Sequence, residues 1–317
     1  MMLPNKFYIA ILTLIVLNIL ALFCILTIYN NDMKLVYKPL ISVVVTSYNY
    51  DKYIEKNLKS ILNQTYKNYE VIIVEDGSSD KSIDIIKKYT NKYKNFHLYT
   101  HPYHQNKGLV ESVKLGISKA SGEYIAFLES DDYWHKDNLY EKVKMINKYK
   151  DAVFIVNNVK PFGNDEAVKI RNQYIERINY TLFKEKNIIP PLELTEFNII
   201  PTFSCVMIKK DVLQALNFDT TIPQFLDFWL YRQILLFYNL YYVRTPLTYW
   251  RQHNSYNSLD KFENAYKHAK INPKEKNPNQ KVKPLFQATR ACFTIENKST
   301  FVETSAGLNV CFIKISL

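Results

Sequence analysis

A regular alternation of short apolar runs with amphipathic stretches, between residues 40 and 130, constrains the fold of this 317-residue chain more than any other feature. Each run is rich in β-branched residues and has strand length, and each following stretch repeats its apolar residues at helical spacing. The expected strands are 41–46, 71–74, 96–99 and 124–128; the expected helices are 53–62, a second one that Ser79 caps, and 109–119. This pattern predicts an α/β fold with a mainly parallel, Rossmann-like sheet and helices on both of its faces.

Polar residues directly follow three of these predicted strands. Thr46 to Asn49 follows the first strand, Asp76 lies just beyond the second, and Glu129 to Asp132 follows the fourth. Because parallel strands end at the same edge of a sheet, where open α/β sheets bind ligands, these residues are expected to lie together. The sequence therefore predicts a binding site for a nucleotide and a metal ion at that edge.

Three acids crowd the end of the fourth predicted strand. Glu129, Asp131 and Asp132 offer the carboxylate oxygens that a hard cation such as Mg²⁺ takes together with the phosphates of a substrate. The alternative is an ordinary loop in which Asp131 or Asp132 caps a helix that begins near Lys136. The polar residues at the other two strand ends favour the metal site.

The second half of the chain repeats its apolar residues less regularly. A strand is expected over 203–208, a helix over 210–216 and an aromatic-rich helix over 226–237. Residues 161–200 have no clean period and are expected to form long loops, and residues 285–317 have no period that predicts any structure.

An almost uninterrupted apolar run covers residues 7–29. It exceeds the roughly 18 residues that indicate a membrane-spanning helix, and no small-residue cleavage site follows it, so an uncleaved single-pass anchor is expected. Lys34 and Lys38 follow the run, whereas only Lys6 precedes it. By the positive-inside rule, this difference favours a cytosolic position for the rest of the chain.

The net charge of +11 is compatible with nucleic acid, an anionic membrane surface or an acidic acceptor. Most basic residues are single lysines spread through predicted helices, and no nucleic-acid-binding motif accompanies them, so a nucleic-acid partner is not expected. A solvated basic surface beside anionic lipid explains the charge. Four cysteines without metal-ligand spacing predict neither a disulfide framework nor a zinc site.

Five segments occur in an order that is typical of one enzyme family. They are Val-Val-Val-Thr-Ser-Tyr-Asn (43–49), Ser-Ile-Leu-Asn-Gln-Thr-Tyr (60–66), Val-Ile-Ile-Val-Glu-Asp-Gly-Ser-Ser-Asp (71–80), Asn-Lys-Gly (106–108) and Ala-Ser-Gly-Glu-Tyr-Ile-Ala-Phe-Leu-Glu-Ser-Asp-Asp-Tyr-Trp (120–134). Over about residues 40–255 the chain resembles family 2 glycosyltransferases of the GT-A fold. The resemblance implies an enzyme that uses a nucleotide-sugar donor.

The resemblance also implies donor-binding roles for residues near the first two strand ends. Tyr48 is expected to lie against uracil or another nucleobase with Thr46 beside it, and Asn49 belongs to the same donor-binding group. Asp76 is expected to accept a hydrogen bond from the base, and Lys107 to meet the diphosphate as a point charge. The alternatives are a core aromatic for Tyr48, a turn residue for Asp76 and a solvated lysine for Lys107.

Asp131 and Asp132 occupy the metal-binding acid positions of the family, which begin with an Asp where this chain has Glu129. The longer Glu129 side chain keeps an acidic ligand but redirects it to the ribose or to a supporting role. Asp131 is expected to bind Mg²⁺ or Mn²⁺ directly, and the metal to bridge the two phosphates of the donor.

The family places its catalytic base in a Glu-Asp pair at the start of a helix, and this pair is not intact here. Asp227 is the available carboxylate, whereas an ungapped match on Trp229 puts Phe225 at the base position and predicts a weak or inactive relative. Asp219 is the next acid to consider. His253, in a segment that resembles the family's late Arg/His segment, is expected either to close over the diphosphate or to be a plain surface residue.

The sequence thus predicts an inverting glycosyltransferase that moves a sugar from a nucleotide donor, with a UDP-sugar as first choice, to a hydroxyl of a saccharide or lipid-linked saccharide. The expected organisation is an anchor and spacer (1–39), a donor-binding half (40–150), an acceptor-binding half of the same domain (151–265) and a tail (266–317). Two alternatives stay open. One is a catalytically inactive, membrane-tethered glycan-binding or scaffold protein, and the other is a nucleotidyltransferase, which would need a glycine-rich loop that Thr46 to Asp51 lacks.

Overall fold

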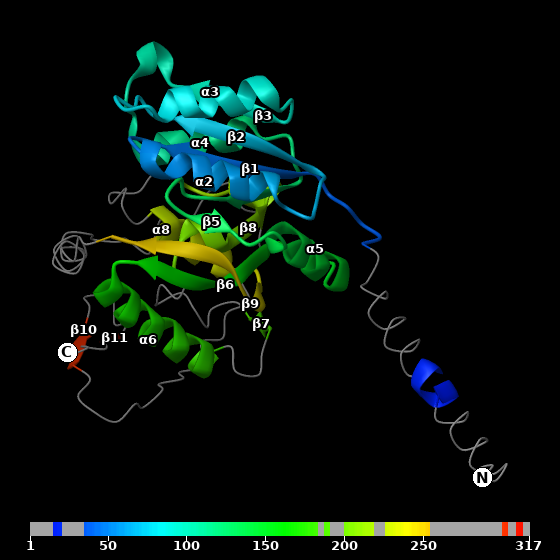
Figure 1. The fold of residues 1–317 in the computed structure, drawn as a ribbon. Helices are drawn as coiled ribbons and strands as arrows, with labels where there is room; N and C mark the ends of the chain where they lie inside the picture. Colours follow the sequence, from blue (N-terminus) through cyan, green and yellow to red (C-terminus); the bar gives the residue numbers. More distant parts are fainter. Residues whose placement is uncertain are drawn as a thin grey trace, which may run out of the picture.

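A nine-stranded sheet in the order β3-β2-β1-β4-β8-β6-β9-β5, with β7 paired to β9, forms the centre of the protein (Figure 1). The computed structural model describes residues 15–20, 35–182, 187–190, 200–218, 226–253, 300–303 and 309–312. The strands of the sheet are β1 (Ile41–Ser47), β2 (Tyr69–Glu75), β3 (Phe96–Thr100), β4 (Tyr124–Phe127), β5 (Tyr133–Trp134), β6 (Phe154–Gly163), β7 (Ile188–Ile189), β8 (Val206–Lys209) and β9 (Leu240–Gln252).

The helices are α2 (Asp51–Leu62), α3 (Ser82–Lys92), α4 (Gly108–Lys119), α5 (Asn138–Lys148), α6 (Asp165–Leu182), α7 (Lys210–Gln214) and α8 (Leu226–Leu235), with short 3-10 turns η1 (Pro102–His104) and η2 (Phe203–Cys205). A separate antiparallel pair joins β10 (Thr300–Glu303) to β11 (Asn309–Phe312).

The first four strands build a parallel half of the sheet, as the alternating sequence pattern predicts. β1 pairs in parallel with β2 and β4, and β2 pairs in parallel with β3. The register aligns Ser47 with Glu75 and Val44 with Phe127, so these strands end near one another. Apolar residues on both faces of these strands suit a sheet that helices cover on two sides.

The other half of the sheet is mixed, so the prediction of a mainly parallel sheet is confirmed for the first half only. β8 runs antiparallel to both β4 and β6, and β5 and β7 run antiparallel to β9, while β6 and β9 are parallel. The physical reason is that an apolar run predicts burial but not direction, because a buried antiparallel strand has the same pattern as a buried parallel one. The pairing of β4 with β8 joins the two halves into one continuous sheet.

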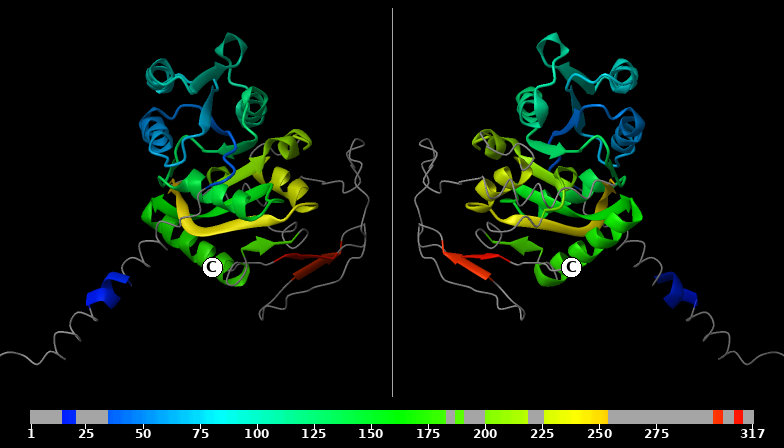
Figure 2. Two further views of the ribbon diagram at one scale, coloured as in Figure 1. Left: turned by 90° about the vertical axis from the view of Figure 1, so that its right-hand side faces the viewer. Right: turned by 90° about the vertical axis from the view of Figure 1, so that its left-hand side faces the viewer.

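The helices bury an apolar cluster on each face of the sheet. α2, α3 and α5 pack on the face that carries Val43 and Val45 of β1, whereas α4, α6, α7 and α8 pack on the face that carries Val44. Figure 2 shows helices on the two sides of the sheet. The prediction of an α/β fold with helices on both faces is confirmed.

Two local predictions differ from the structure. Residues 165–182, expected to lie in a long loop, form helix α6, whose apolar side chains such as Ile175 pack on the sheet. Ser79 does not cap α3, because its own N–H and hydroxyl both bond to the side chain of Asn49. Asp80 performs the local capping instead, since its carboxylate accepts the N–H of Ser82 at 2.9 Å.

Residues 15–20 are the described part of the predicted membrane anchor 7–29. They are helical, and their apolar side chains, among them Leu17 and Ile19, are exposed. None of the helices in the described part of the chain combines the length and the apolar character that a membrane crossing requires. The rest of the predicted anchor lies outside the described residues.

Candidate functional site

The polar residues that follow β1, β2 and β4 lie at one edge of the sheet, as the sequence predicts. The N–H of Asp76, just after β2, donates to the carbonyl of Ser47 at the end of β1. The N–H of Leu128, just after β4, donates to the carbonyl of Val44 in β1. These bonds extend the parallel ladder to the strand ends, so the loops that follow start side by side.

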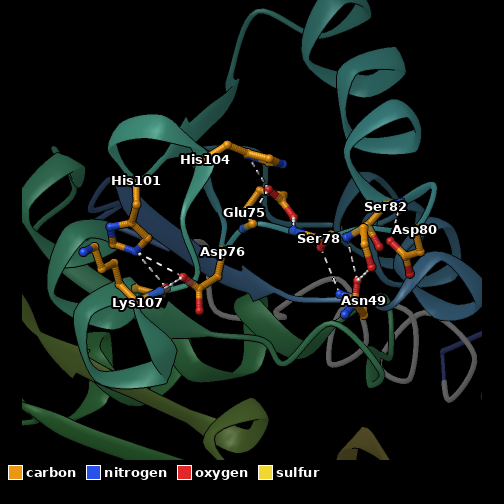
Figure 3. A network of polar contacts seen from close by, with 12 residues as sticks. Asn49, Glu75, Asp76, Ser78, Asp80, Ser82, His101, His104 and Lys107 are labelled. Carbon is orange, nitrogen blue, oxygen red and sulfur yellow. Dashed lines mark hydrogen bonds and ion pairs between the residues drawn. The ribbon is translucent and has the colours of Figure 1, made fainter.

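Two carboxylates at the end of β2 hold neighbouring loops in place (Figure 3). Asp76 is buried, and its two oxygens accept the N–H groups of Lys107 and Gly108 at 2.7 and 2.9 Å. Glu75 is fully buried and accepts the N–H groups of Gly77 and Ser78 at 3.2 and 2.7 Å. Both carboxylates therefore have backbone donors in the fold itself.

Two histidines of the loop around η1 approach the same carboxylates. Nε2 of His101 lies 3.5 Å from Asp76, and Nδ1 of His104 lies 3.4 Å from Glu75. Gly77, with φ of +78°, packs so tightly against this loop that an added Cβ would lie 2.7 Å from the carbonyl oxygen of His104. The sequence Glu-Asp-Gly thus positions the loop that leads to Lys107.

The loop after β1 is fixed to the loop after β2. Asn49 adopts φ of +56°, and its side-chain oxygen accepts the N–H of Ser79 at 2.9 Å while its own N–H donates to the hydroxyl of Ser78. Tyr48, beside it, is 46% exposed, and Thr46 is partly exposed. Tyr48 is therefore not a core aromatic, and its predicted contact with a nucleobase stays a prediction.

The three acids after β4 form a crowded cluster that we call the acid cluster (Glu129, Asp131 and Asp132). Asp132 is buried, with Oδ1 accepting the N–H of Arg251 at 2.7 Å and Oδ2 lying 3.3 Å from the hydroxyl of Thr202. The same hydroxyl contacts the carboxylate of Glu129. Because a hydroxyl has one hydrogen, Thr202 can donate to only one of these two carboxylates at a time.

Burial and mutual repulsion make the charges of the acid cluster costly. Burial, followed by the charge of Asp131, raises the pKa of Glu129 to about 7, and the nearby Asp227 adds to this effect. Burial and then the charges of Asp131 and Glu129 raise the pKa of Asp132 well above its ordinary value. A cation bound here would relieve that repulsion.

The end of β9 reaches the acid cluster from the other half of the sheet. Nε2 of His253 lies 2.8 Å from Oδ2 of Asp131. Arg251 donates from Nε to the carbonyl of Asp131 at 3.0 Å, in addition to its backbone bond to Asp132. Because side chains alternate along a strand, Tyr249 and Arg251 share one face of β9, and His253 directly follows its last residue.

The donor set at this point fits a divalent cation. Asp131 and His253 supply a carboxylate oxygen and an imidazole nitrogen that already converge. Asp132, the other predicted ligand, has both oxygens engaged by the protein, so direct coordination by it stays a prediction. No group of three or more potential His, Cys, Asp or Glu ligands occurs among the described residues, and phosphates of a substrate would complete the coordination.

The structure places the remaining predicted residues as follows. Asp227 lies in the first turn of α8, and its charge is close enough to raise the pKa of Glu129. Lys107 has an exposed side chain, and only its backbone N–H contacts Asp76. Asp219 and Phe225, the other positions considered for the base, lie outside the described residues.

Sequence reasoning missed the hydroxyls that support the acid cluster. Ser204 accepts the N–H of Glu129 at 3.0 Å, and its carbonyl accepts the indole N–H of Trp134 at 2.6 Å. Thr202 accepts the N–H of Ser204 at 3.1 Å. Short hydroxyl residues at the start of the predicted strand 203–208, Thr202 just before it and Ser204 within it, were the available signal, but nothing in the sequence connects them with residues 129–132.

Comparisons with known proteins agree with this geometry. The model of Glycosyl transferase family 2 matches residues 42–216. An uncharacterized glycosyltransferase of Haemophilus influenzae is 31% identical over 182 residues, which cover 57% of this chain and 66% of that protein, slightly less than two thirds of its length.

Two solved structures share the fold. TarS of S. aureus in complex with UDP has a TM-score of 0.51 at 20% identity, covering 67% of this chain and 60% of TarS. A mannosyltransferase of Pyrobaculum calidifontis in complex with GDP-Man and Mn²⁺ has a TM-score of 0.53 at 17% identity, covering 75% of this chain and 67% of that one. The expected fold of the GT-A type is thereby confirmed.

Proposed function

We propose that this chain, which belongs to glycosyl transferase family 2, moves a sugar from a nucleotide-sugar donor to a hydroxyl group of a saccharide or lipid-linked acceptor. The observation that carries the proposal is the convergence of Asp131 and His253, 2.8 Å apart, beside the buried Asp132 and the partly buried Glu129 at the carboxyl edge of the parallel half of the sheet. A UDP-sugar is the first donor to test, and a GDP-sugar the second.

A divalent metal ion is part of the proposal. Bound Mg²⁺ or Mn²⁺ would supply positive charge that stabilises the leaving nucleoside diphosphate. Asp131 and His253 would hold it, while Thr202 and Ser204 keep Glu129 and Asp132 in place around it. Tyr48 is exposed at the nucleobase end of the same edge, and Asp76 fixes the loop from which Lys107 projects.

Asp227 is the proposed base that accepts the proton of the acceptor hydroxyl. It lies at the start of α8, on the acceptor half of the chain, and its charge acts on Glu129 of the acid cluster. A single base and no covalent intermediate would invert the configuration at the anomeric carbon.

The anchor and its orientation are a separate proposal. Residues 7–29 would hold the enzyme in a membrane with residues 40–265 in the cytosol, a proposal supported by the exposed apolar side chains of residues 15–20 and by Lys34 and Lys38. Protease treatment of sealed vesicles measures the orientation. Protection of the large domain would reverse it, and extraction of the protein by carbonate would rule out a spanning helix.

The experiment that tests the activity combines ligand binding with turnover. Purified protein with Mn²⁺ is screened against UDP- and GDP-sugars by thermal shift, because a ligand that binds only the native state raises its melting temperature. Release of the nucleotide from the best ligand is then measured. We expect one class of nucleotide sugar to raise the melting temperature of the protein and to be hydrolysed slowly. Binding of saccharides without binding of any nucleotide sugar would instead favour the inactive glycan-binding alternative.

A further inference from the structure

Three basic side chains surround a group of aromatic rings beside the acid cluster. Nζ of Lys56, in α2, lies 3.6 Å from the ring centre of Tyr133, and the guanidinium of Arg251 lies 4.5 Å from that of Phe162. Tyr133 contacts Phe162 edge to face at 5.1 Å, and the charge of Lys160 also acts on Tyr133. We call this group the cationic patch (Lys56, Lys160 and Arg251).

The strand registers of β5, β6 and β9 build this patch. Tyr249 of β9 aligns with Tyr133 on one side and with Lys160 on the other, and Arg251 aligns with Phe162. Residues that align across neighbouring strands point to the same face. The patch therefore continues along the same face of β9 that ends at His253.

The cations of the patch have no carboxylate partners. Among the residues that the structure describes, no ion pair joins a carboxylate to Lys56, Lys160 or Arg251. Burial and then the charge of Arg251 lower the pKa of Lys56, which shows that the two cations repel each other. The aromatic faces compensate for part of this repulsion.

We propose that the cationic patch binds a phosphate group of the acceptor. The proposal rests on the proposed function and narrows its acceptor to one that carries a phosphate near the accepting hydroxyl. A phosphate ester offers several oxygens, which suit the forked guanidinium of Arg251 and two ammonium groups together.

The position of the patch assigns it to the acceptor rather than to the donor. Strand order places the predicted nucleobase contacts at β1 and β2, whereas Lys160 and Arg251 lie on β6 and β9, beyond β4 and its acid cluster. Lys56 reaches the patch from α2, over the ring of Tyr133 in β5. Nε of Arg251 donates to the carbonyl of Asp131 at 3.0 Å, so the patch begins directly beside Asp131 and His253. An acceptor phosphate bound there would bring a neighbouring hydroxyl towards the acid cluster.

Binding of small phosphate probes to the full-length protein tests the proposal. With UDP and Mn²⁺ saturating and at low ionic strength, which limits screening of exposed charges, glycerol 3-phosphate and glycerophosphoglycerol are titrated by calorimetry, with glycerol as the neutral control. We expect the phosphate probes to bind and glycerol not to bind. Tighter binding of glycerol 3-phosphate would indicate a terminal phosphate, as on a lipid-linked acceptor. Tighter binding of glycerophosphoglycerol would indicate an internal phosphate, as in a polymer.

A double substitution, Lys56→Gln with Lys160→Gln, should weaken probe binding by about tenfold or more and leave UDP binding unchanged. The matched control is Lys92→Gln with Lys148→Gln, which removes the same charge and two exposed lysines that also lie over tyrosine rings, at 5.3 and 5.0 Å. This control should bind the probe like the wild type.

Three outcomes would overturn the proposal. They are absence of probe binding, equal loss in the matched control, and displacement of UDP by the probe, which would assign the cations to the donor diphosphate. Binding of UDP is recorded before each titration. A failure of the proposed donor function is therefore visible as loss of UDP binding, separately from a failure of the patch.

Discussion

The carboxylates that follow β2 and those that follow β4 occupy the same edge of the sheet but are treated differently by the fold. Glu75 and Asp76 each accept two backbone N–H groups from neighbouring loops. The acid cluster has fewer donors: Asp132 receives one backbone N–H, and Glu129 and Asp132 share a single hydroxyl hydrogen from Thr202.

This difference separates carboxylates that the fold matches with backbone donors from carboxylates that suit the proposed cation. Acids whose oxygens are matched by backbone donors lower the energy of the folded loops. Acids crowded together and buried raise one another's pKa, and either protonation or a bound cation relieves the repulsion between their charges. Substitution should therefore reduce stability at the end of β2 and reduce activity at the end of β4.

The largest expected effect is that of Asp131→Asn. Removing the carboxylate that pairs with His253 should lower the transfer rate by about 10⁴-fold or more, because a metal ion contributes several kcal/mol to the transition state. The melting temperature should stay the same or rise, since the charge repulsion is relieved. Rates with and without Mn²⁺ are compared with those of Asp84→Asn, an exposed acid of α3, and an unchanged rate and Mn²⁺ dependence would disprove the assignment.

Asp227→Asn should give the next largest effect. If Asp227 is the base, transfer should fall by about 10²–10⁴-fold while UDP binding stays nearly unchanged, because the substitution removes the proton acceptor and not a donor contact. Single-turnover rates and UDP affinity separate these two properties. Full activity in this variant would place the base elsewhere, and Asp219 would be the next residue to substitute.

Asp76→Asn should affect stability more than chemistry. The N–H groups of Lys107 and Gly108 donate to the two oxygens of Asp76. The single side-chain oxygen of an asparagine can accept a hydrogen bond from one of them, but its NH₂ group is a donor and cannot accept from the other. We expect the free energy of unfolding to fall by about 3 kcal/mol, measured by urea denaturation. A variant as stable as the wild type would show that Asp76 is reserved for a ligand, and the comparison between the two strand ends would fail.

Lys142→Met should have the smallest effect and the opposite sign. Lys142 is fully buried in α5, its Nζ has no hydrogen-bond partner in the described part of the protein, and burial lowers its pKa to about 7 despite the opposing effect of Cys205. Methionine should raise the free energy of unfolding by about 2 kcal/mol at pH 7.

The gain from Lys142→Met should depend on pH. The unfolded lysine holds its proton up to about pH 10.4, whereas the folded one loses it near pH 7. Between these values the unfolded wild type binds more protons, so its stability rises with pH across this window. The advantage of methionine should thus be greatest at pH 7 and below and shrink towards pH 10; a constant gain would contradict the assigned pKa.

Local patterns predicted the donor half of the fold well. β1, β2 and β4 are continuous apolar runs, and α2 and α4 repeat their apolar residues at helical spacing, so each element is visible within its own sequence. α6 was missed because only part of one face is buried, as at Ile175, and β5 and β7 are too short to have a period. Strand direction in the second half depends on partners far away in the chain, which no local pattern contains.

The sequence likewise predicted only the part of the candidate site that is local in the chain. The acid cluster was predictable because its members are adjacent in the sequence and follow a strand. The approach of His253 to Asp131, the support from Thr202 and Ser204, and the contact between Lys56 and Tyr133 all join segments that are more than 70 residues apart. These contacts require the curved path of the sheet from β4 to β9.

The alternation of side chains along β9 limits how this protein can diverge. Tyr249, Arg251 and His253 face the candidate site, while Trp250 faces the apolar cluster beneath it. Insertion or deletion of one residue would exchange these faces, burying Arg251 and exposing Trp250. New acceptor preferences can therefore arise by replacement of side chains at constant strand length. Libraries that vary positions 249 and 251 without changing the spacing to His253 would keep the contact between His253 and Asp131.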